Sequence, residues 1–345
     1  MKRMAWVVAA LVGAPVGGQE VVRVSGNDVA IYNLAGRVEI MRGGGPEVVV
    51  RIGRGGRDSA SLRVETGDVG GRPTLRVIFP DDEIVYPEMG RGSNTTVSVR
   101  DDGTFGDGGG SRGDRVRIRG SGTGLEAWAD LLIEVPAGRT VSAYLAVGAM
   151  DASGVAGNLR LDTGSGRVTA SDITGALDID TGSGSVTVSG VDGGLNLDTG
   201  SGTVDVSDVR GEEVRIDTGS GRIGVTGVEA GVFRVDTGSG SVELARISST
   251  DVVVDTGSGR VEIELLTDVE RLVVDTGSGG ITVRAPADLG AMVEIDTGSG
   301  GIDLDFPLEV SSVRRDRVRG RLGDGQGTIR IDTGSGAVRI QRLAN

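Results

Sequence analysis

The stretch Val252-Val253-Val254-Asp255-Thr256-Gly257-Ser258-Gly259-Arg260-Val261 decides the fold of this chain, because its central pentapeptide recurs. Asp-Thr-Gly-Ser-Gly occurs nine times, at successive spacings of 18, 18, 19, 19, 19, 20, 21 and 36 residues. The copies begin at Asp162, Asp180, Asp198, Asp217, Asp236, Asp255, Asp275, Asp296 and Asp332. Self-similarity at a period of about 20 residues indicates a stacked repeat architecture.

Apolar residues flank the copies at fixed positions. If the Asp is numbered 0, positions −3 and −1 are apolar, as in Val252 and Val254, and position +6 is always Val or Ile. Positions +8 and +11 are also apolar in most copies, as in Ile263 and Leu266. Residues two apart on a strand face the same side. Each coil is therefore expected to hold two or three short strands with one apolar side.

One such coil cannot bury its apolar side alone, whereas stacked coils share a continuous core. The pattern predicts an all-β fold: a parallel β-solenoid with coils of about 18–21 residues. The handedness of the solenoid stays open.

The pentapeptide itself is expected to form a corner of the coil. Gly at +2 and at +4 can adopt positive φ without a steric penalty. The Asp side chain can accept hydrogen bonds from turn amides, as in an Asx-turn. Thr at +1 has the inward parity of position −1 and is expected to stack as a buried row. The nine Asp residues would then form a ladder with a structural role.

Two functional alternatives exist for this pentapeptide. Val253-Val254-Asp255-Thr256-Gly257-Ser258 is similar to the signature of pepsin-like aspartic proteases. That chemistry needs two aspartates that share a proton, whereas the copies here follow one another at coil spacing. The calcium-binding nonapeptide repeat has a different glycine spacing. A weak association of divalent cations with the Asp ladder stays open, and no specific metal site is expected.

The first residues have the features of an export signal. Lys2 and Arg3 precede an apolar run that ends in a segment of small residues, so residues 1–18 are expected to be a signal peptide. No other long apolar stretch follows, and no transmembrane anchor is expected in the mature chain. The chain contains no cysteine. We expect an extracytoplasmic protein, either periplasmic, on the cell surface or secreted.

Residues 19–145 also alternate in the manner of strands, for example at Val97/Val99 and Val116/Ile118. We expect an N-terminal β region, sandwich-like or made of irregular coils, that caps the solenoid repeat domain of residues 146–345. The Gly- and Asp-rich segment 101–114 is expected to be a loop. The formal net charge of −13 disfavours nucleic acid as a partner.

The period is interrupted by an insertion at residues 306–327. This insertion is rich in arginine, and two interpretations apply: an elongated coil with an exposed strand, or a basic patch that binds an acidic partner. The candidate partner-binding residues are Arg314, Arg315, Arg317, Arg319 and Arg321.

The composition limits the chemistry that the chain can perform. It contains no histidine, so the usual general base near neutral pH is absent, as are typical zinc sites and Ser-His or Cys-His catalysis. Carboxylates alone can hydrolyse glycosidic bonds, but sugar-binding aromatic side chains are scarce, at 3%. We expect no catalytic residues and no cofactor.

Several motifs together resemble a known family. They are the serial Asp-Thr-Gly-Ser-Gly coils, the run from Gly124 to Gly138, and the segment Gly320-Arg321-Leu322-Gly323-Asp324-Gly325 before Ile329. With the export signal, these resemble the bacterial putative-adhesin family of unknown function, over about residues 25–342. The resemblance implies a secreted or envelope-associated β-solenoid and supplies no catalytic residues.

The function expected from these observations is that of a non-enzymatic, exported, adhesin-like surface or interaction scaffold, whose partner is an unidentified protein or surface glycan. One alternative is an envelope-stress or signalling accessory that binds a membrane partner. Another is a polysaccharide-active β-helix enzyme.

Overall fold

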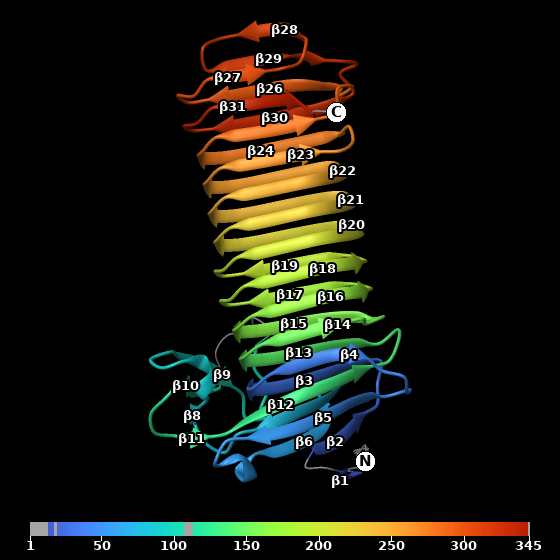
Figure 1. The fold of residues 1–345 in the computed structure, drawn as a ribbon, viewed down its shortest axis with the longest axis vertical. Coiled ribbons are helices and arrows are strands. Elements are labelled where there is room, and N and C mark those ends of the chain that lie inside the picture. Colours follow the sequence, from blue (N-terminus) through green and yellow to red (C-terminus); the bar gives the residue numbers. More distant parts are fainter. Residues whose placement is uncertain (1–12, 17–18, 107–112, 344–345) are drawn as a thin grey trace, which may run out of the picture. The chain divides into compact units, whose positions relative to one another are not determined.

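The computed structural model describes residues 13–16, 19–106 and 113–343. The chain divides into two compact units, residues 1–184 and residues 185–345. Most of the predicted signal peptide lies outside the described residues, and so does part of the predicted loop at 101–114. Figure 1 shows both units as stacks of strands, which confirms the predicted all-β, solenoid fold.

The first unit begins with antiparallel strands and continues as coils. Its main strands are β1 (Gly13–Val16), β2 (Gln19–Val24), β3 (Asp28–Ala35), β4 (Val38–Arg42), β5 (Val48–Gly55), β6 (Arg63–Val69), β7 (Arg72–Ile78), β12 (Trp128–Val135), β13 (Thr140–Val147), β14 (Met150–Ser153), β15 (Asn158–Ser165), β16 (Val168–Thr174) and β17 (Leu177–Thr181). Two short 3-10 helices, η1 (Ser59–Ser61) and η2 (Pro87–Met89), interrupt them.

The antiparallel strands cover the first coil of this unit. β2, β5 and β12 pair antiparallel in that order, and β12 then pairs parallel with β4. β6 and β7 form a hairpin, and β7 pairs parallel with β3. β3 and β4 form the first coil, because they pair parallel with β13 and β14 of the next. The predicted boundary at residues 145/146 lies inside β13, which also pairs parallel with β15.

A separate four-stranded sheet belongs to the same unit, with the strand order β11-β8-β10-β9. Its strands are β8 (Glu83–Val85), β9 (Asn94–Val99), β10 (Asp114–Arg119) and β11 (Leu125–Glu126). We call it the side sheet.

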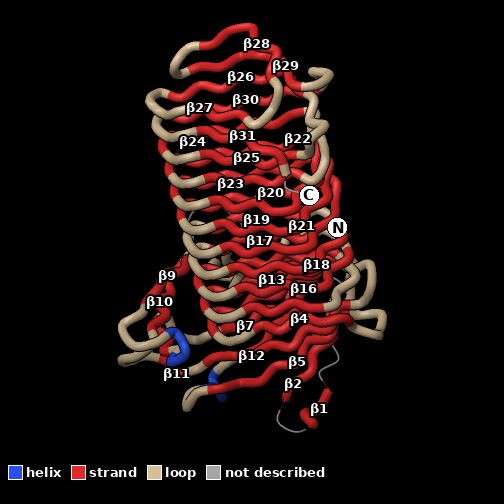
Figure 2. The backbone as a smooth tube through the Cα atoms, turned by 45° about the horizontal axis from the view of Figure 1, so that its top comes forward, coloured by secondary structure: helices blue, strands red, loops and turns tan. Residues whose placement is uncertain are grey.

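The second unit consists of successive coils and a terminal hairpin. Its strands are β18 (Val186–Asp192), β19 (Leu195–Thr199), β20 (Val204–Ser220), β21 (Ile223–Ser239), β22 (Val242–Ser258), β23 (Val261–Leu265), β24 (Arg271–Ser278), β25 (Ile281–Ala285), β26 (Ala291–Thr297), β27 (Ile302–Leu304), β28 (Leu308–Val313), β29 (Arg317–Leu322), β30 (Gly327–Thr333) and β31 (Val338–Arg342). In Figure 2 the strands of these coils are joined by short tan turns. β20, β21 and β22 are each 17 residues long, so a coil here is one bent strand rather than the predicted two or three.

The interior of the second unit follows the predicted parity. In the coil of Asp236, the buried side chains are Phe233, Val235, Thr237, Val242, Leu244 and Ile247. The Thr at position +1 is at most 1% exposed in every copy of the pentapeptide. The buried Thr row is therefore confirmed. Stacking of these inward side chains is the main source of stability, because burial of apolar area is the dominant favourable term in folding.

The corner glycines at +4 have the predicted positive φ in every copy except that of Gly300, and those at +2 do not. Gly240 at +4 has φ +145°, and a Cβ there would lie 1.7 Å from the carbonyl oxygen of Gly221 in the coil before it. Gly238 at +2 does not have positive φ, but a Cβ on it would lie 2.7 Å from the carbonyl oxygen of Gly219. Glycine is required at +2 by the close approach of successive coils rather than by backbone conformation.

A β-bulge lies at position +10, where the residue has left-handed φ in several coils. The second unit shows it at Asp208 (φ 53°), Gly227 (φ 74°) and Arg246 (φ 57°). This bulge reverses the alternation, so that both +8 and +11 point inward. The coil of Asp255 lacks the bulge, and there Leu265 at +10 is buried whereas Leu266 at +11 is 44% exposed. The expectation of an inward Leu266 is wrong for this reason.

The order of the last coils differs from their order in sequence. β30 pairs parallel with β24 on one side and with β26 on the other, so Asp332 lies between Asp275 and Asp296. β31 lies in the same way between β25 and β27. Figure 1 shows this final coil in red between orange strands that precede it in the chain. β26, β29 and β28 then pair antiparallel in that order, which places β28 at an edge.

Candidate functional site

The Asp ladder is a row of outward carboxylates, and within the second unit it can be followed residue by residue. Each Asp lies in an extended strand between the inward positions −1 and +1. Strand pairing places the row in the order Asp198, Asp217, Asp236, Asp255, Asp275, Asp332 and Asp296. In the first unit, Asp162 and Asp180 are paired in the same way.

The predicted Asx-type caps are not formed in the middle of this ladder. Within the described residues of the second unit, the carboxylates of Asp236, Asp255 and Asp275 accept no hydrogen bond from a turn amide. The reason is geometric. Position 0 belongs to a strand, and the turn begins only at the glycine of position +4, so the turn amides lie beyond the reach of the Asp side chain.

The ladder raises the pKa of some of its members. Burial, followed by the charges of Asp236 and Asp275, raises the pKa of Asp255 above its ordinary value. Burial, followed by the charges of Asp275 and Asp296, raises the pKa of Asp332 in spite of opposing arginines. Desolvation and like charges both disfavour ionisation. Strand pairing therefore holds these carboxylates in a row, and their mutual repulsion does not stabilise the fold.

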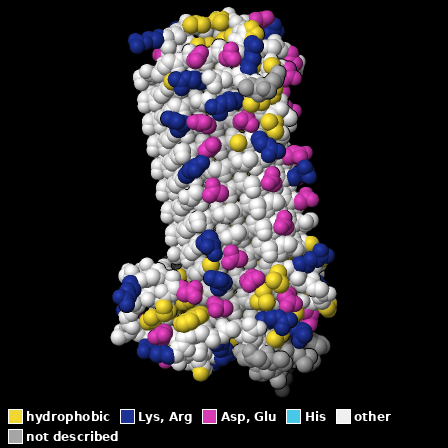
Figure 3. Space-filling view, in the orientation of Figure 1, with side chains coloured by type: hydrophobic (Ala, Val, Ile, Leu, Met, Phe, Trp, Pro, Cys, Tyr) yellow, Lys and Arg dark blue, Asp and Glu magenta, His cyan; other side chains and the backbone are white. Residues whose placement is uncertain are grey.

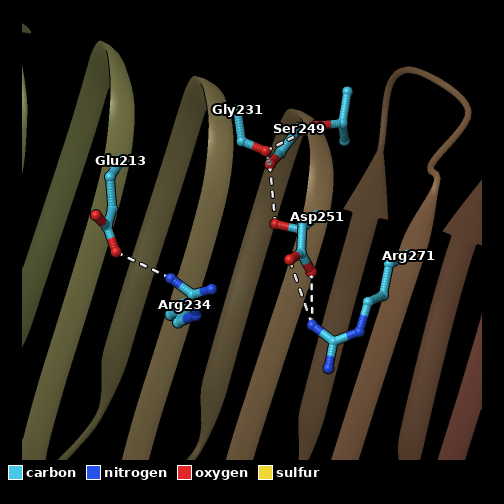
Figure 4. Close-up of polar contacts among 7 residues, drawn as sticks. Glu213, Gly231, Arg234, Ser249, Asp251 and Arg271 are labelled. Atoms are coloured by element: carbon cyan, nitrogen blue, oxygen red, sulfur yellow. Dashed lines mark hydrogen bonds and ion pairs between the residues drawn. The ribbon is translucent and has the colours of Figure 1, made fainter.

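Beside the ladder, charges of opposite sign are matched from coil to coil. Figure 4 shows Glu213 paired with Arg234 and Asp251 paired with Arg271, each at 2.9 Å across adjacent strands. Ser249 donates a hydrogen bond to the carbonyl oxygen of Gly231 in the same view. Such exposed pairs add little stability individually. These pairs neutralise charges beside the ladder, whereas the ladder carboxylates of Asp236, Asp255 and Asp275 remain a row of like charges.

The arginines of the insertion divide into two groups. Arg317 pairs with Asp296, Arg319 with Glu294, and Arg321 with Glu309 at 2.7 Å. The hydrogen bond from Arg317 to Asp296 also raises the pKa of the guanidinium group. These three arginines extend the coil-to-coil charge pairing. Their charge is therefore already matched within the chain.

Arg314 and Arg315 lie in the turn between β28 and β29 and are exposed. Within the described residues their side chains form no ion pair. The predicted partner-binding patch thus reduces to these two residues as charges available to a partner. The hairpin also supports the interpretation of the insertion as an elongated coil with an exposed strand, since β28 exposes Val310 at 54% and Val313 at 61%.

Sequence reasoning missed an aromatic cluster beneath the side sheet. Tyr32 and Tyr144 stack with ring centroids 4.4 Å apart, and Phe105 packs edge-on against Tyr32 at 5.6 Å. Tyr144 is paired with Asp162 and occupies position 0 of its coil. Phe105 lies in the segment expected to be a loop, yet it is only 3% exposed. The sequence signal for this cluster was that apolar and polar residues do not alternate in β3 and β13. Both strands are buried on both faces.

A shallow hollow of about 260 Å³ lies on the outer side of β20 and β21. Gly224 is one of the residues that line it, and so are Arg222 and Glu243, which form an ion pair. Among the described residues, no group of three or more Asp and Glu side chains is arranged to hold a metal ion. No helix long and apolar enough to cross a membrane occurs in the described part of the chain.

Comparison with known proteins identifies a family for part of the chain. Residues 192–341 match the family model described as Toastrack DUF4097. This match confirms the family resemblance that the repeated motifs indicated, for a stretch that lies within the second unit. No curated protein matches the sequence.

Two solved structures are similar over most of the chain. One is a putative cell adhesion protein from Clostridium sporogenes ATCC 15579, at 11% identity and a TM-score of 0.23, covering 94% of this chain and 99% of that one. The other is a putative adhesin from Bacteroides fragilis NCTC 9343, at 9% identity and a TM-score of 0.37, covering 94% and 98%. Likenesses at this level carry no argument about function.

Proposed function

From the Toastrack match over residues 192–341, we propose that this chain is a non-enzymatic, extracytoplasmic interaction scaffold of the adhesin-like kind. The observation that carries the proposal is the regular outer surface of the second unit. Successive coils present charged side chains at a constant spacing along paired strands, as the ion pairs of Arg234 and Arg271 illustrate. A repetitive surface of this kind suits recognition of an extended partner.

The chemistry of the chain is consistent with binding rather than catalysis. The repeated Asp residues follow one another along strands of adjacent coils, one per coil, rather than meeting as a pair that could share a proton. The hollow at Gly224 is open and small for a ligand pocket, since such pockets usually span about 300–1,000 Å³ and enclose most of the ligand. The signal peptide expected at residues 1–18 supports placement outside the cytoplasm.

The proposal is tested by fractionation and by a surface-binding assay. The full chain, expressed in a bacterial host, is expected in the periplasmic, surface or culture-medium fraction. Purified protein immobilised on beads is expected to retain cell-envelope polysaccharide or whole cells. Beads that carry heat-unfolded chain serve as the control.

Two results would contradict the proposal. The first is recovery of the chain in the cytoplasm only. The second is stoichiometric capture of a single membrane protein from solubilised envelopes without any binding to cells or polysaccharide, which would favour a signalling accessory instead.

A further inference from the structure

The side sheet carries an unusual row of arginines on its outer face. Val116 and Ile118 of β10 point inward and are buried, so Arg115, Arg117 and Arg119 share the opposite face. Figure 3 shows dark blue basic side chains at the outer side of this sheet. The chain as a whole is acidic, with a net charge of −13, so a basic face of this kind is an exception that needs an explanation.

The residues across from this row are neutral. β9 pairs antiparallel with β10, which places Ser98 opposite Arg115, Thr96 opposite Arg117, and Asn94 opposite Arg119. Opposite charges on facing strand positions stabilise a sheet, and the second unit uses such pairs repeatedly, as at Arg234 and Glu213. On the β9 side the arginines of β10 instead lie beside hydroxyl and amide groups, whereas on the other side β8 places Glu83 opposite Arg117.

In the part of the chain that the structure describes, a single carboxylate pairs with this row. Glu83 of β8 lies 2.7 Å from Arg119 and 3.6 Å from Arg117, and so is shared between two guanidinium groups. Arg115 has no ion-pair partner among the described residues. The face therefore keeps an excess of positive charge and several unused donors, because a guanidinium carries five N–H groups.

These groups border a hollow of about 350 Å³ at the end of the sheet. Its lining consists of Arg117, Arg119, Asn94, Thr96 and three small residues, Gly92, Ser93 and Ser121. No apolar side chain and no carboxylate lines it. The hollow is open to solvent, which suits contact with part of a long polymer rather than enclosure of a small ligand.

We propose that this hollow binds an acidic polysaccharide through its oxyanion groups. Arginine binds carboxylate and sulfate oxygens by paired, charge-assisted hydrogen bonds. Arg117 and Arg119 are two strand residues apart, about 7 Å, which allows each to meet an anion on a neighbouring sugar. Asn94, Thr96 and the two serines are suited to sugar hydroxyl groups. A protein partner is disfavoured, because the lining offers no apolar or aromatic side chain to form the packed centre of a protein interface.

This inference rests on the proposed function and names its ligand class. The test is isothermal titration calorimetry of the full chain with oligogalacturonate as the carboxylated probe, dextran sulfate as the sulfated probe, and dextran as the neutral probe. We expect binding of at least one acidic probe, weakened by added salt, and no binding of dextran. The two acidic arms decide whether the oxyanion is a carboxylate or a sulfate.

Four variants test which side chains bind the probe. Arg117→Gln combined with Arg119→Gln is expected to weaken binding at least tenfold. Arg23→Gln combined with Arg63→Gln removes the same formal charge from exposed positions of β2 and β6, outside the side sheet, and is expected to leave affinity unchanged. Glu83→Gln removes the competing carboxylate and is expected to strengthen binding. Arg117→Gln alone, at a side chain that is 50% exposed, keeps the test valid if the double variant does not fold.

Several results would overturn the inference. Equal losses in the two double-arginine variants would show attraction by net charge alone. Weaker binding by Glu83→Gln would show that Glu83 does not compete with the ligand for Arg117 and Arg119. Binding of polyglutamate or of phosphatidylserine vesicles, but of neither acidic polysaccharide, would assign the face to another class of partner. If the double variant at Arg117 and Arg119 still attaches to cells as the unchanged chain does, this hollow is excluded while the proposed function stands.

Discussion

Asp255 lies in the middle of the outward carboxylate ladder, and its pKa is raised by burial and by the charges of Asp236 and Asp275. A carboxyl whose folded-state pKa exceeds its unfolded value, which is about 4, binds protons more tightly in the folded state. Its contribution to stability is therefore present at pH values below about 4 and is lost as the pH rises through the folded-state pKa. At neutral pH the ionised Asp255 opposes folding.

We predict that Asp255→Asn raises the melting temperature at pH 7, because it removes a like charge from the row. The effect is expected to be small, about 1 °C, since the side chain is exposed and its charge is screened. The difference from the unchanged chain is expected to shrink as the pH is lowered towards 4. Thermal unfolding followed by circular dichroism across pH 4–7 measures it.

Asp296→Asn is the matched control for this prediction. Asp296 occupies the same position of the repeat, but its carboxylate is paired with Arg317. The same substitution is expected to lower the melting temperature there slightly, because it removes the partner of Arg317. If both variants shift the melting temperature in the same direction, the ladder does not act through the charges described.

Among the elements, β30 and β28 make the clearest contrast, because both belong to the C-terminal part of the chain. β30 lies between β24 and β26, and Ile331 is 1% exposed. β28 pairs on one side only, with β29, and has an irregular register between Val310 and Ser312. Bulges of this kind and charged neighbours are common at sheet edges, where they discourage pairing with another chain.

We predict that Ile331→Ala costs about 2–5 kcal/mol of unfolding free energy, as expected for the removal of buried side-chain atoms from a packed core. Val310→Ala in β28 is expected to change it by no more than about 0.5 kcal/mol, because Val310 is 54% exposed. Chemical denaturation measures both. Similar costs for the two substitutions would mean that the final coil is not inserted between its neighbours.

The sequence predicted the elements better than their order. Parity around the pentapeptide correctly assigned Val254 and Thr256 to the interior, because burial of alternate residues is a local property. The stacking of β30 on β24 could not be predicted, since identical pentapeptides at Asp275, Asp296 and Asp332 make the alternative registers equivalent in sequence. Leu266 was wrongly predicted to point inward, because the 20-residue coil of Asp255 lacks the bulge that shorter coils have at position +10.

The candidate site was predictable only in part, for a related reason. The sequence indicated the insertion by its arginines, but not that Arg317 and Arg319 pair with acids of β26, more than 20 residues away in sequence. The row on β10 alternates with Val116 and Ile118, so its common face was readable from the sequence. What could not be read was the neutral strand β9 beside it, because antiparallel partners are fixed by the fold.

At the scale of the whole molecule, the second unit is a repeat array in which coils pair with their neighbours in one register. Val204 of β20 is paired with Ile223 of β21, and Ile223 with Val242 of β22. The stability of such an array is close to a sum over coils and their interfaces. The number of coils is therefore not fixed by the fold of any one of them.

We predict that deletion of residues 223–241, which is one complete coil, leaves a folded chain, because Val242 then follows Arg222 as Ile223 did. Deletion of residues 223–240 is the control. It places Ser241 at the inward position and exchanges the faces of the strand that follows. Far-UV circular dichroism and thermal unfolding are expected to show a cooperative transition for the first variant and its loss for the second. Equal behaviour of the two would contradict repeat-level additivity.

The insertion of β30 and β31 between earlier coils has a consequence for biosynthesis. Residues 291–304 leave the ribosome before residues 327–342, so β26 and β27 are made before the strands that separate them from β24 and β25. Until those strands arrive, the nascent chain has two coils with identical pentapeptides that can stack on each other out of order. The native arrangement of these coils is completed only after residues 327–342 have been translated. A chain interrupted upstream of residue 327 lacks the segment that completes it, and the unpaired strands it leaves offer quality-control proteases a means of recognising it.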